Sequence, residues 1–273
     1  MKYMKILMVL SAVCVFFASE APAVDRNITI KGSTTILPIS QRTAEVFMGK
    51  NPEINMSVQG GGSSVGIVSL IDGTADIGQA SRPMRESEIE RAQRKKVSPK
   101  MHIIAMDGIT VVVHPTNAVN RLTIGQIRDI YLGKISDWSE VGAQEREIVV
   151  VSRDSSSGTY EQFSIKALGG ARTRPDSLLQ ASNQAVAQTV AMTPGAIGYI
   201  GLGYVSDRVK PLKVNGVRCT KETVMSNRYP LSRFLFMYTD GDPSGEVKQY
   251  LDFVLSQQGQ RIVENCGYVS LFH

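Results

Sequence analysis

Short apolar, β-branched runs alternate along the chain with amphipathic stretches, and polar residues gather where one pattern changes into the other. Runs with alternating apolar positions predict strands, and stretches with helical spacing predict helices. Three strand–turn–helix units share one layout, with strands at 28–31, 55–59 and 147–152 and turns at 32–35, 60–64 and 153–159. Each turn is rich in glycine and hydroxyl side chains. Strands that alternate with helices are typical of parallel sheets covered by helices, so the sequence predicts an α/β fold.

The remaining pattern predicts further strands and helices. The strands lie at 102–106, 109–114, 195–200 and 233–239, and the helices at 86–96, 123–133, 183–192 and 246–263. Asp107 and Gly108 separate the first two of these strands, and Asp-Gly is a common turn sequence. No long proline- or serine-rich linker divides the chain. If the chain has two lobes, we therefore expect ordered strands to join them.

Composition and charge narrow the functional classes. With 273 residues, 42% of them hydrophobic and 20% charged, the chain reads as globular and can form two modest lobes. A sequence pI of about 9.1 would suit a nucleic-acid-binding protein. However, the one dense basic cluster, at 91–96, follows glutamates at the start of the same predicted helix, an arrangement that suits the helix dipole. We therefore expect a solvent-facing helix there and no nucleic-acid partner.

Residues 1–23 have the layout of a secretory signal peptide. Lysines precede an apolar stretch, and Ala21-Pro22-Ala23 fits the small-x-small cleavage pattern. The apolar stretch is too short for a comfortable membrane-spanning helix. A lipid-modified Cys14 is the alternative, but Val13 is a poor small residue and the apolar run continues past it. We therefore expect an exported protein from which residues 1–23 are cleaved.

Cleavage would leave two cysteines, Cys219 and Cys266. In an oxidising compartment such a pair can form a disulfide, and we expect that bond here, although two reduced core cysteines would give the same sequence pattern. The chain has no C-x-x-C motif and only three histidines, so no metal site is expected.

The three polar turns predict a site for a small anion. The first N–H groups of a helix have no partner within the helix, and the helix dipole makes that end partly positive. At any single turn, Ser or Thr can simply cap its own helix. Three such turns at the carboxyl ends of parallel strands form a typical ligand site. Arg153 adds a planar fork that suits a tetrahedral oxyanion.

Common nucleotide and hydrolase motifs are missing from these turns. GGGSSVG lacks the G-K-[ST] of a phosphate loop, and GSTT lacks G-x-G-x-x-G. No G-x-S-x-G occurs, and none of the histidines stands in a recognisable catalytic context. The sequence therefore predicts no catalytic residue and no cofactor.

Seven segments follow one another in a specific order: GSTTILPI, QGGGSSVGI, DIGQASRPM, MDGITVVVHP, IYLGKISDW, RDSSSGT and TPGAIGYIGLGY. Together they resemble the periplasmic phosphate-binding proteins of bacterial phosphate importers, over nearly all of the chain after residue 23. The resemblance implies the two-lobed type II periplasmic binding-protein fold, in which each lobe is a mainly parallel sheet flanked by helices. Lobe I would comprise 24–107 and 231–273, and lobe II 108–230, with hinge crossovers near Gly108 and Pro230.

The resemblance also implies a set of phosphate-binding residues in the cleft between the lobes. By motif, these are Thr34, Thr35, Ser63, Arg153, Ser157, Gly158 and Thr159. Thr35 and Gly158 would act mainly through their backbone N–H groups.

One position departs from the family pattern. The best-known members carry an aspartate after the A-S of the third segment, where it accepts a proton from phosphate, but this chain has Arg82. Those members also lack an acid at the position of Asp107. We therefore expect Arg82 to lie beside the anion and Asp107 to accept the proton, with Asp154 as the second choice. The alternatives are an exposed loop arginine at 82 and a simple turn at Asp107-Gly108.

The resemblance implies a periplasmic, monomeric, non-enzymatic protein that captures inorganic phosphate and delivers it to the membrane permease of an ABC importer. Two alternatives remain open at this point. One is a binding protein for another oxyanion, such as sulfate or molybdate, and the other is a secreted phosphatase on a similar scaffold.

Overall fold

The computed structural model describes residues 26–272. Its strands are β1 (Arg26–Gly32), β2 (Ile54–Gln59), β3 (Ile77–Ala80), β4 (Pro99–Val113), β5 (Arg121–Leu122), β6 (Val149–Arg153), β7 (Leu178–Gln180), β8 (Ala196–Gly201), β9 (Lys210–Pro211), β10 (Lys213–Val214) and β11 (Ser232–Asp240). Its α-helices are α1 (Leu37–Lys50), α2 (Ser63–Ile71), α3 (Glu86–Arg94), α4 (Ile124–Tyr131), α5 (Gly158–Phe163), α6 (Asn183–Met192), α7 (Lys221–Met225), α8 (Gly245–Leu255) and α9 (Gln257–Asn265). Among residues 26–272, none of the helices combines the length and apolar character that a membrane crossing requires.

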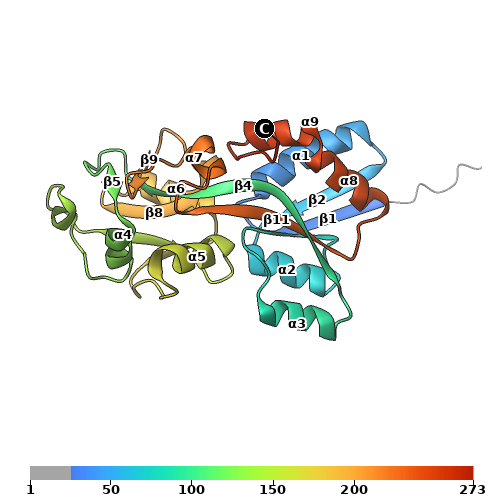
Figure 1. Cartoon of the computed structure of the whole chain (residues 1–273), viewed down its shortest axis with the longest axis horizontal. Helices are drawn as coiled ribbons and strands as arrows, with labels where there is room; N and C mark the ends of the chain where they lie inside the picture. Colours follow the sequence, from blue (N-terminus) through green and yellow to red (C-terminus); the bar gives the residue numbers. More distant parts are fainter. Residues whose placement is uncertain (1–25, 273) are drawn as a thin grey trace, which may run out of the picture.

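Nine strands form one curled sheet, in the order β2-β1-β3-β11-β4-β8-β6-β7 with β9 alongside β4. Figure 1 shows two lobes along the long axis, with β1 and β2 in lobe I and β8 in lobe II. Within each lobe the consecutive strand–helix units pair in parallel: β1 with β2 and β3, and β6 with β7 and β8. The predicted α/β class and two-lobed fold are confirmed, whereas the exact lobe boundaries stay a prediction.

The two faces of β11 show why lobe I needs helices on both sides of its sheet. Leu235 and Met237 pack in one apolar core with α1, α8 and α9, while Phe236 and Tyr238 pack in another with α2 and α3. Because side chains alternate between the faces of a strand, one continuous apolar run serves both cores. Full burial of each such side chain contributes about 1.5–3 kcal/mol.

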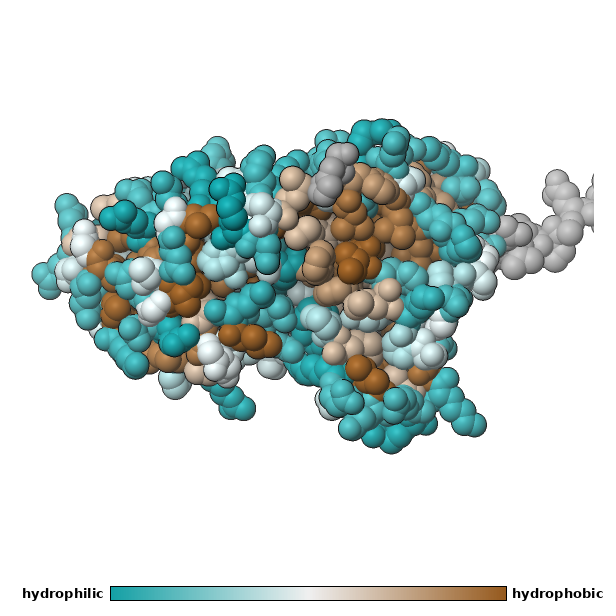
Figure 2. All heavy atoms as spheres, in the orientation of Figure 1, coloured by the Kyte–Doolittle hydropathy of each residue, from teal (hydrophilic) through white to brown (hydrophobic). Residues whose placement is uncertain are grey.

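Lobe II repeats this arrangement with the second half of β4. Val111 and Val113 pack with α4 and α5, whereas Val112 faces α6. These cores contain different residues from those of lobe I, so each lobe buries its own apolar side chains. On the face drawn in Figure 2, hydrophilic residues form most of the outline and apolar residues show in patches over both lobes.

Strands β4 and β11 run from one lobe into the other (Figure 1). β4 pairs antiparallel with β11 up to Gly108 and then continues with β8 from Ile109. The two strands predicted at 102–106 and 109–114 are therefore one, and the turn interpretation of Asp107-Gly108 is wrong. Pairing on both sides of the junction keeps the chain extended there. Gly108 is needed for space instead, because a Cβ at this position would lie 2.3 Å from Cys219 Sγ.

The helix predicted at 246–263 is in fact two helices, α8 and α9, that meet at Ser256. The Ser256 hydroxyl accepts a hydrogen bond from the Gly259 N–H and so caps α9. The apolar spacing continues across this break, which is why periodicity alone predicted a single helix.

The predicted disulfide is wrong, because Cys219 and Cys266 are both free. Cys219 is buried in the core of lobe II, where burial raises the pKa of its thiol to about 12. Cys266 ends α9 in lobe I, and its thiol donates to the carbonyl of Pro38 at 3.6 Å. The two thiols therefore belong to different cores.

Candidate functional site

The polar turns of the two lobes meet where β1, β2 and β6 end. The Ser64 N–H donates to the Ser156 carbonyl at 3.0 Å, and the Ser156 hydroxyl donates to the Gly61 carbonyl at 3.0 Å. This contact requires glycine at 62, where φ is +95° and a Cβ would lie 2.4 Å from Ser156 Oγ. The lobes are therefore in direct contact at their glycine- and hydroxyl-rich helix starts.

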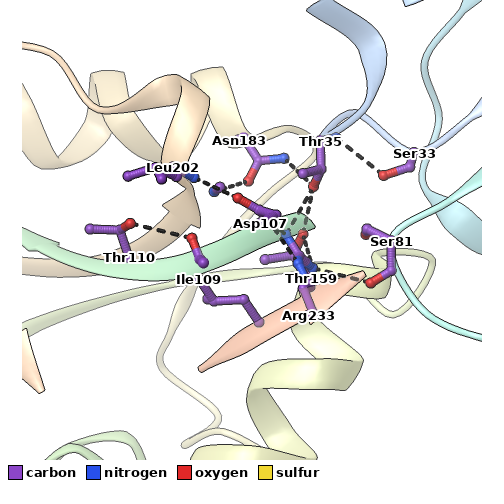
Figure 3. A network of polar contacts seen from close by, with 12 residues as sticks. Ser33, Thr35, Ser81, Asp107, Ile109, Thr110, Thr159, Asn183, Leu202 and Arg233 are labelled. Atoms are coloured by element: carbon purple, nitrogen blue, oxygen red, sulfur yellow. Dashed lines mark hydrogen bonds and ion pairs between the residues drawn. The ribbon is translucent and has the colours of Figure 1, made fainter. Parts of the chain in front are cut away.

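Hydroxyl groups from both lobes gather behind this contact (Figure 3). Thr35 of lobe I and Thr159 of lobe II share a hydrogen bond of 2.9 Å. The Asn183 side-chain amide donates to the hydroxyls of Thr34 and Thr35, at 3.1 Å each. All four side chains are buried. The backbone N–H of Thr35 donates to Ser33 Oγ at 3.2 Å, so it is the threonine's hydroxyl that faces this group.

Arg233 lies at the centre of this group, and the sequence analysis missed it. Its guanidinium donates to Thr159 Oγ1 at 3.0 Å and to Thr35 Oγ1 at 3.3 Å. It also forms an ion pair with Asp107, with Nη2 and Oδ2 2.6 Å apart. In the sequence, the sign of a special role is that a charged arginine begins the apolar run RFLFMYT. Only the register of β11 on β4 shows that it faces Asp107.

Asp107 is fully buried and surrounded by donors from the protein. Oδ2 accepts from Nε and Nη2 of Arg233, and Oδ1 accepts from the Leu202 N–H at 2.8 Å. Burial raises the pKa of Asp107, while the charge of Arg233 opposes that shift. One carboxylate oxygen therefore holds Arg233, and the other holds the backbone at Leu202.

Arg153 is buried at the end of β6 and keeps one nitrogen without a partner. Nε donates to the Gln180 carbonyl at 2.9 Å and Nη2 to the Ala181 carbonyl at 3.0 Å. Nη1 is buried with no hydrogen-bond partner among the described residues. Burial lowers the pKa of Arg153, and the carboxylate of Asp154, 4.0 Å from Nη2, opposes the shift. An unpaired buried donor is costly, so this nitrogen indicates a ligand.

Ser63 and Gly158 bring the remaining helix starts together. The Ser63 hydroxyl accepts from the Ser81 N–H at 3.0 Å. A Cβ at Gly158 would lie 2.3 Å from Ser63 Oγ, so only glycine allows α5 to approach this closely. Ser157 accepts from the Tyr160 N–H and caps α5, as any helix-start serine can.

The structure does not bring Arg82 into this group. Its side chain is buried, and its terminal nitrogens donate to the carboxylate of Glu88 at 2.7 Å each. Asp154 also has a local partner, since its Oδ1 accepts from the Ser156 N–H at 2.8 Å. Arg82 Nη2 also donates to the Ser64 hydroxyl at 3.0 Å, at the start of α2. Residue 82 is therefore buried rather than exposed, and its contacts lie beside the group formed by Thr34, Thr35, Thr159 and Asn183 rather than within it.

Two tyrosines, also missed, fix the turn that carries Thr34 and Thr35. The hydroxyl of Tyr204 donates to the Thr34 carbonyl at 2.5 Å, and that of Tyr268 to the Thr35 carbonyl at 2.6 Å. Nothing in the local sequence distinguishes them from core tyrosines. Among residues 26–272, no cluster of three or more His, Cys, Asp or Glu side chains could hold a metal ion.

Comparisons with known proteins give a consistent set of relatives. A family model described as "PBP superfamily domain" matches residues 18–258. The phosphate-binding protein PstS of Bacillus subtilis is 32% identical over 248 residues, covering 89% of this chain and 80% of its own. That of Borreliella burgdorferi is 31% identical, with 90% and 91% covered.

Solved structures give the same result. A Clostridium perfringens protein assigned as a phosphate ABC transporter substrate-binding protein, solved with bound phosphate, has a TM-score of 0.85 at 34% identity. The match covers 90% of this chain and 100% of that one. An ABC-type phosphate transport receptor from Vibrio cholerae has a TM-score of 0.74 at 32% identity, with 89% and 99% covered.

Proposed function

Because the chain belongs to the PBP superfamily, and within it to the phosphate-binding proteins of ABC importers, we propose that it captures inorganic phosphate between its lobes and delivers it to such an importer. The observation that carries the proposal is the charge balance of the buried site. Of the site's two buried arginines, Arg233 pairs with the buried carboxylate of Asp107, whereas Arg153 has only the partly exposed carboxylate of Asp154, 4.0 Å from its Nη2, and no buried counter-charge. A bound anion would supply the missing negative charge and the partner for Arg153 Nη1.

We assign the anion's ligands to both lobes. Arg153 offers its free nitrogen, and hydroxyl and N–H donors come from Thr34, Thr35, Ser63, Ser157, Gly158 and Thr159. Arg233 joins them through its place between Thr35 and Thr159. Asp107 orients Arg233, and Arg82 acts outside the anion's immediate surroundings. Ligands from both lobes make binding favour the closed arrangement, a behaviour typical of hinged binding proteins.

Binding without catalysis fits the chemistry of these side chains. The hydroxyls of Thr34, Thr35 and Thr159 are bound to one another, to Arg233 or to Asn183. Neither histidine among residues 26–272 contacts them, since His102 contacts Thr239 and His114 contacts Thr116. We therefore propose a receptor with no enzymatic activity.

The setting that we propose is the periplasm. Residues 1–23, which lie outside the described residues, would direct export and be removed. The exported chain would act as a monomer, without a nucleic-acid partner, and the membrane permease would recognise its closed form.

Calorimetry on the chain from residue 24 tests this proposal. Phosphate should bind with 1:1 stoichiometry, whereas sulfate and molybdate should bind far more weakly. Tighter binding of sulfate or molybdate would favour the other oxyanion, and no binding of any of these anions would contradict the proposal. Turnover of a phosphomonoester by the same sample would favour the secreted phosphatase.

A further inference from the structure

Glu161 of α5 reaches across the cleft to two arginines of lobe I. Its Oε2 lies 2.8 Å from Arg82 Nε and accepts hydrogen bonds from Nε and Nη2 of Arg85, the former at 2.8 Å. The Glu161 side chain is 22% exposed, that of Arg85 43% and that of Arg82 0%. One carboxylate oxygen of lobe II is thus enclosed by two cations of lobe I.

Glu88 sets the orientation of Arg82 in this cluster. Its two oxygens take the terminal nitrogens of Arg82, Nη1 and Nη2, at 2.7 Å each. The bidentate contact leaves the Nε edge of the guanidinium for Glu161. Oε2 of Glu88 also accepts from the Arg85 N–H at 2.8 Å and fixes the start of α3. Lobe I therefore holds the Arg82 guanidinium and the backbone of Arg85, whereas the Arg85 guanidinium bonds to Glu161 of lobe II.

Charge counting shows why Glu161 matters to both lobes. In lobe I, Arg82 and Arg85 carry two positive charges and Glu88 one negative charge, which leaves one uncompensated positive charge. Glu161 brings the compensating charge from lobe II. Arg82 is buried, and among residues 26–272 its Nε has the ion pair with Glu161 but no hydrogen bond. Separating the lobes therefore removes a counter-charge from a desolvated cation.

We propose that Glu161, Arg82 and Arg85 form an electrostatic latch that stabilises the closed lobes and so sets the affinity for phosphate without contacting it. This inference rests on the proposed phosphate-binding function. A ligand that binds only one of two conformations has an apparent affinity that scales with the population of that conformation. The latch also gives residue 82 a role. Where the best-known members of the family carry an aspartate, this chain has an arginine that acts in closure of the lobes.

The test is phosphate calorimetry and stopped-flow dissociation on Glu161→Gln, with Glu145→Gln as the control. Glu145 is an exposed glutamate of lobe II, so the control removes the same charge far from the latch. We expect a dissociation constant about 10-fold higher for Glu161→Gln, mainly through faster dissociation, and no change for Glu145→Gln. Raising the salt concentration should weaken binding by the wild type more than by Glu161→Gln.

Arg85→Gln provides an independent variant on the other lobe. Its side chain is partly exposed, so the fold should tolerate the change, and affinity should fall by less than in Glu161→Gln, because Arg82 still faces Glu161. The double variant should bind no more weakly than Glu161→Gln alone, because Glu161→Gln already removes the ion pair with Arg85. Normal phosphate affinity in Glu161→Gln and Arg85→Gln, beside a wild type that binds phosphate, would overturn the latch. A wild type that does not bind phosphate would instead contradict the proposed function.

Discussion

Arg233 and Asp107 are directly paired residues of β11 and β4, and their side chains meet with Nη2 and Oδ2 2.6 Å apart. The same guanidinium contacts Thr35 of lobe I and Thr159 of lobe II. The two strands that join the lobes therefore also carry a charged group of the site. Movement of one lobe relative to the other would change the contacts of this arginine and, through them, the anion binding that we propose.

Arg153→Ala should weaken phosphate binding by about 2–4 kcal/mol, because it removes a buried, charge-assisted donor whose Nη1 has no partner among residues 26–272. Arg153→Lys should also lose affinity, since an ammonium group cannot reproduce the planar fork. Arg208→Ala, at an exposed position of lobe II, is the control. Calorimetric titration measures all three variants, and unchanged affinity in Arg153→Ala would remove this residue from the site.

Asp107→Asn should lower the free energy of unfolding by about 3–5 kcal/mol, because Arg233 would remain buried without its counter-charge. Phosphate affinity should fall with it, while rejection of sulfate should persist, since both carboxylate oxygens already accept from protein donors. Urea unfolding and sulfate calorimetry measure the two effects. A variant that gains sulfate binding would show instead that Asp107 accepts the proton of phosphate. Asp252→Asn, which breaks an exposed pair with Lys248, should change stability by less than about 1 kcal/mol.

The unfolded chain from residue 24, kept without reductant, should give two reactive thiols. In the folded chain Cys219 should react very slowly, because it is 8% exposed and burial raises the pKa of its thiol to about 12. Titration with a thiol reagent before and after unfolding gives both results. A complete absence of thiols in the unfolded sample would show that Cys219 and Cys266 form a disulfide.

The pair of Glu88 with Arg82 should make stability fall in acid. Burial acts to raise the pKa of Glu88, but hydrogen bonds from Arg82 and the Arg85 N–H outweigh it and hold the pKa below its ordinary value of 4.5. A carboxyl with a lowered pKa in the folded state stabilises that state above the unfolded pKa. This contribution is lost as the pH falls below about 4.5.

Unfolding of Glu88→Gln as a function of pH measures the effect. The variant should be less stable at pH 7 and lose less stability below pH about 4.5 than the wild type. Glu90→Gln, at a side chain of α3 that is 56% exposed, is the control. Parallel pH profiles for Glu88→Gln and the wild type would contradict the assignment.

Local sequence patterns predicted those parts of the candidate site that lie within one continuous stretch of the chain. The start of α5 is an example, because Arg153, Ser157 and Gly158 all follow one apolar strand. Arg233 could not be found in this way, since its partner lies 126 positions away and only strand register brings the two together. The turn interpretation of Asp107-Gly108 was wrong because turn propensity depends on the local sequence alone. Pairing with β11 and β8 keeps the strand extended at this point.

The cysteines and the last helix show the same limit. Counting cysteines gives a possible pair but no distance, and here each thiol lies in the core of a different lobe. Ser256 looks like any polar position on a helix until its hydroxyl is seen to cap α9. Arg82 was expected beside the anion from its place in the third motif, yet Glu88, in the first turn of the next helix, takes its guanidinium.

A crystal structure of the chain from residue 24 grown with phosphate tests the central claim most directly. We expect one phosphate between the lobes, with Arg153 Nη1 about 2.7–2.9 Å from a phosphate oxygen and with Thr35 and Thr159 as further ligands. Phosphate bound elsewhere, or a cleft in which Arg153 Nη1 stays without contact to the bound anion, would contradict the account.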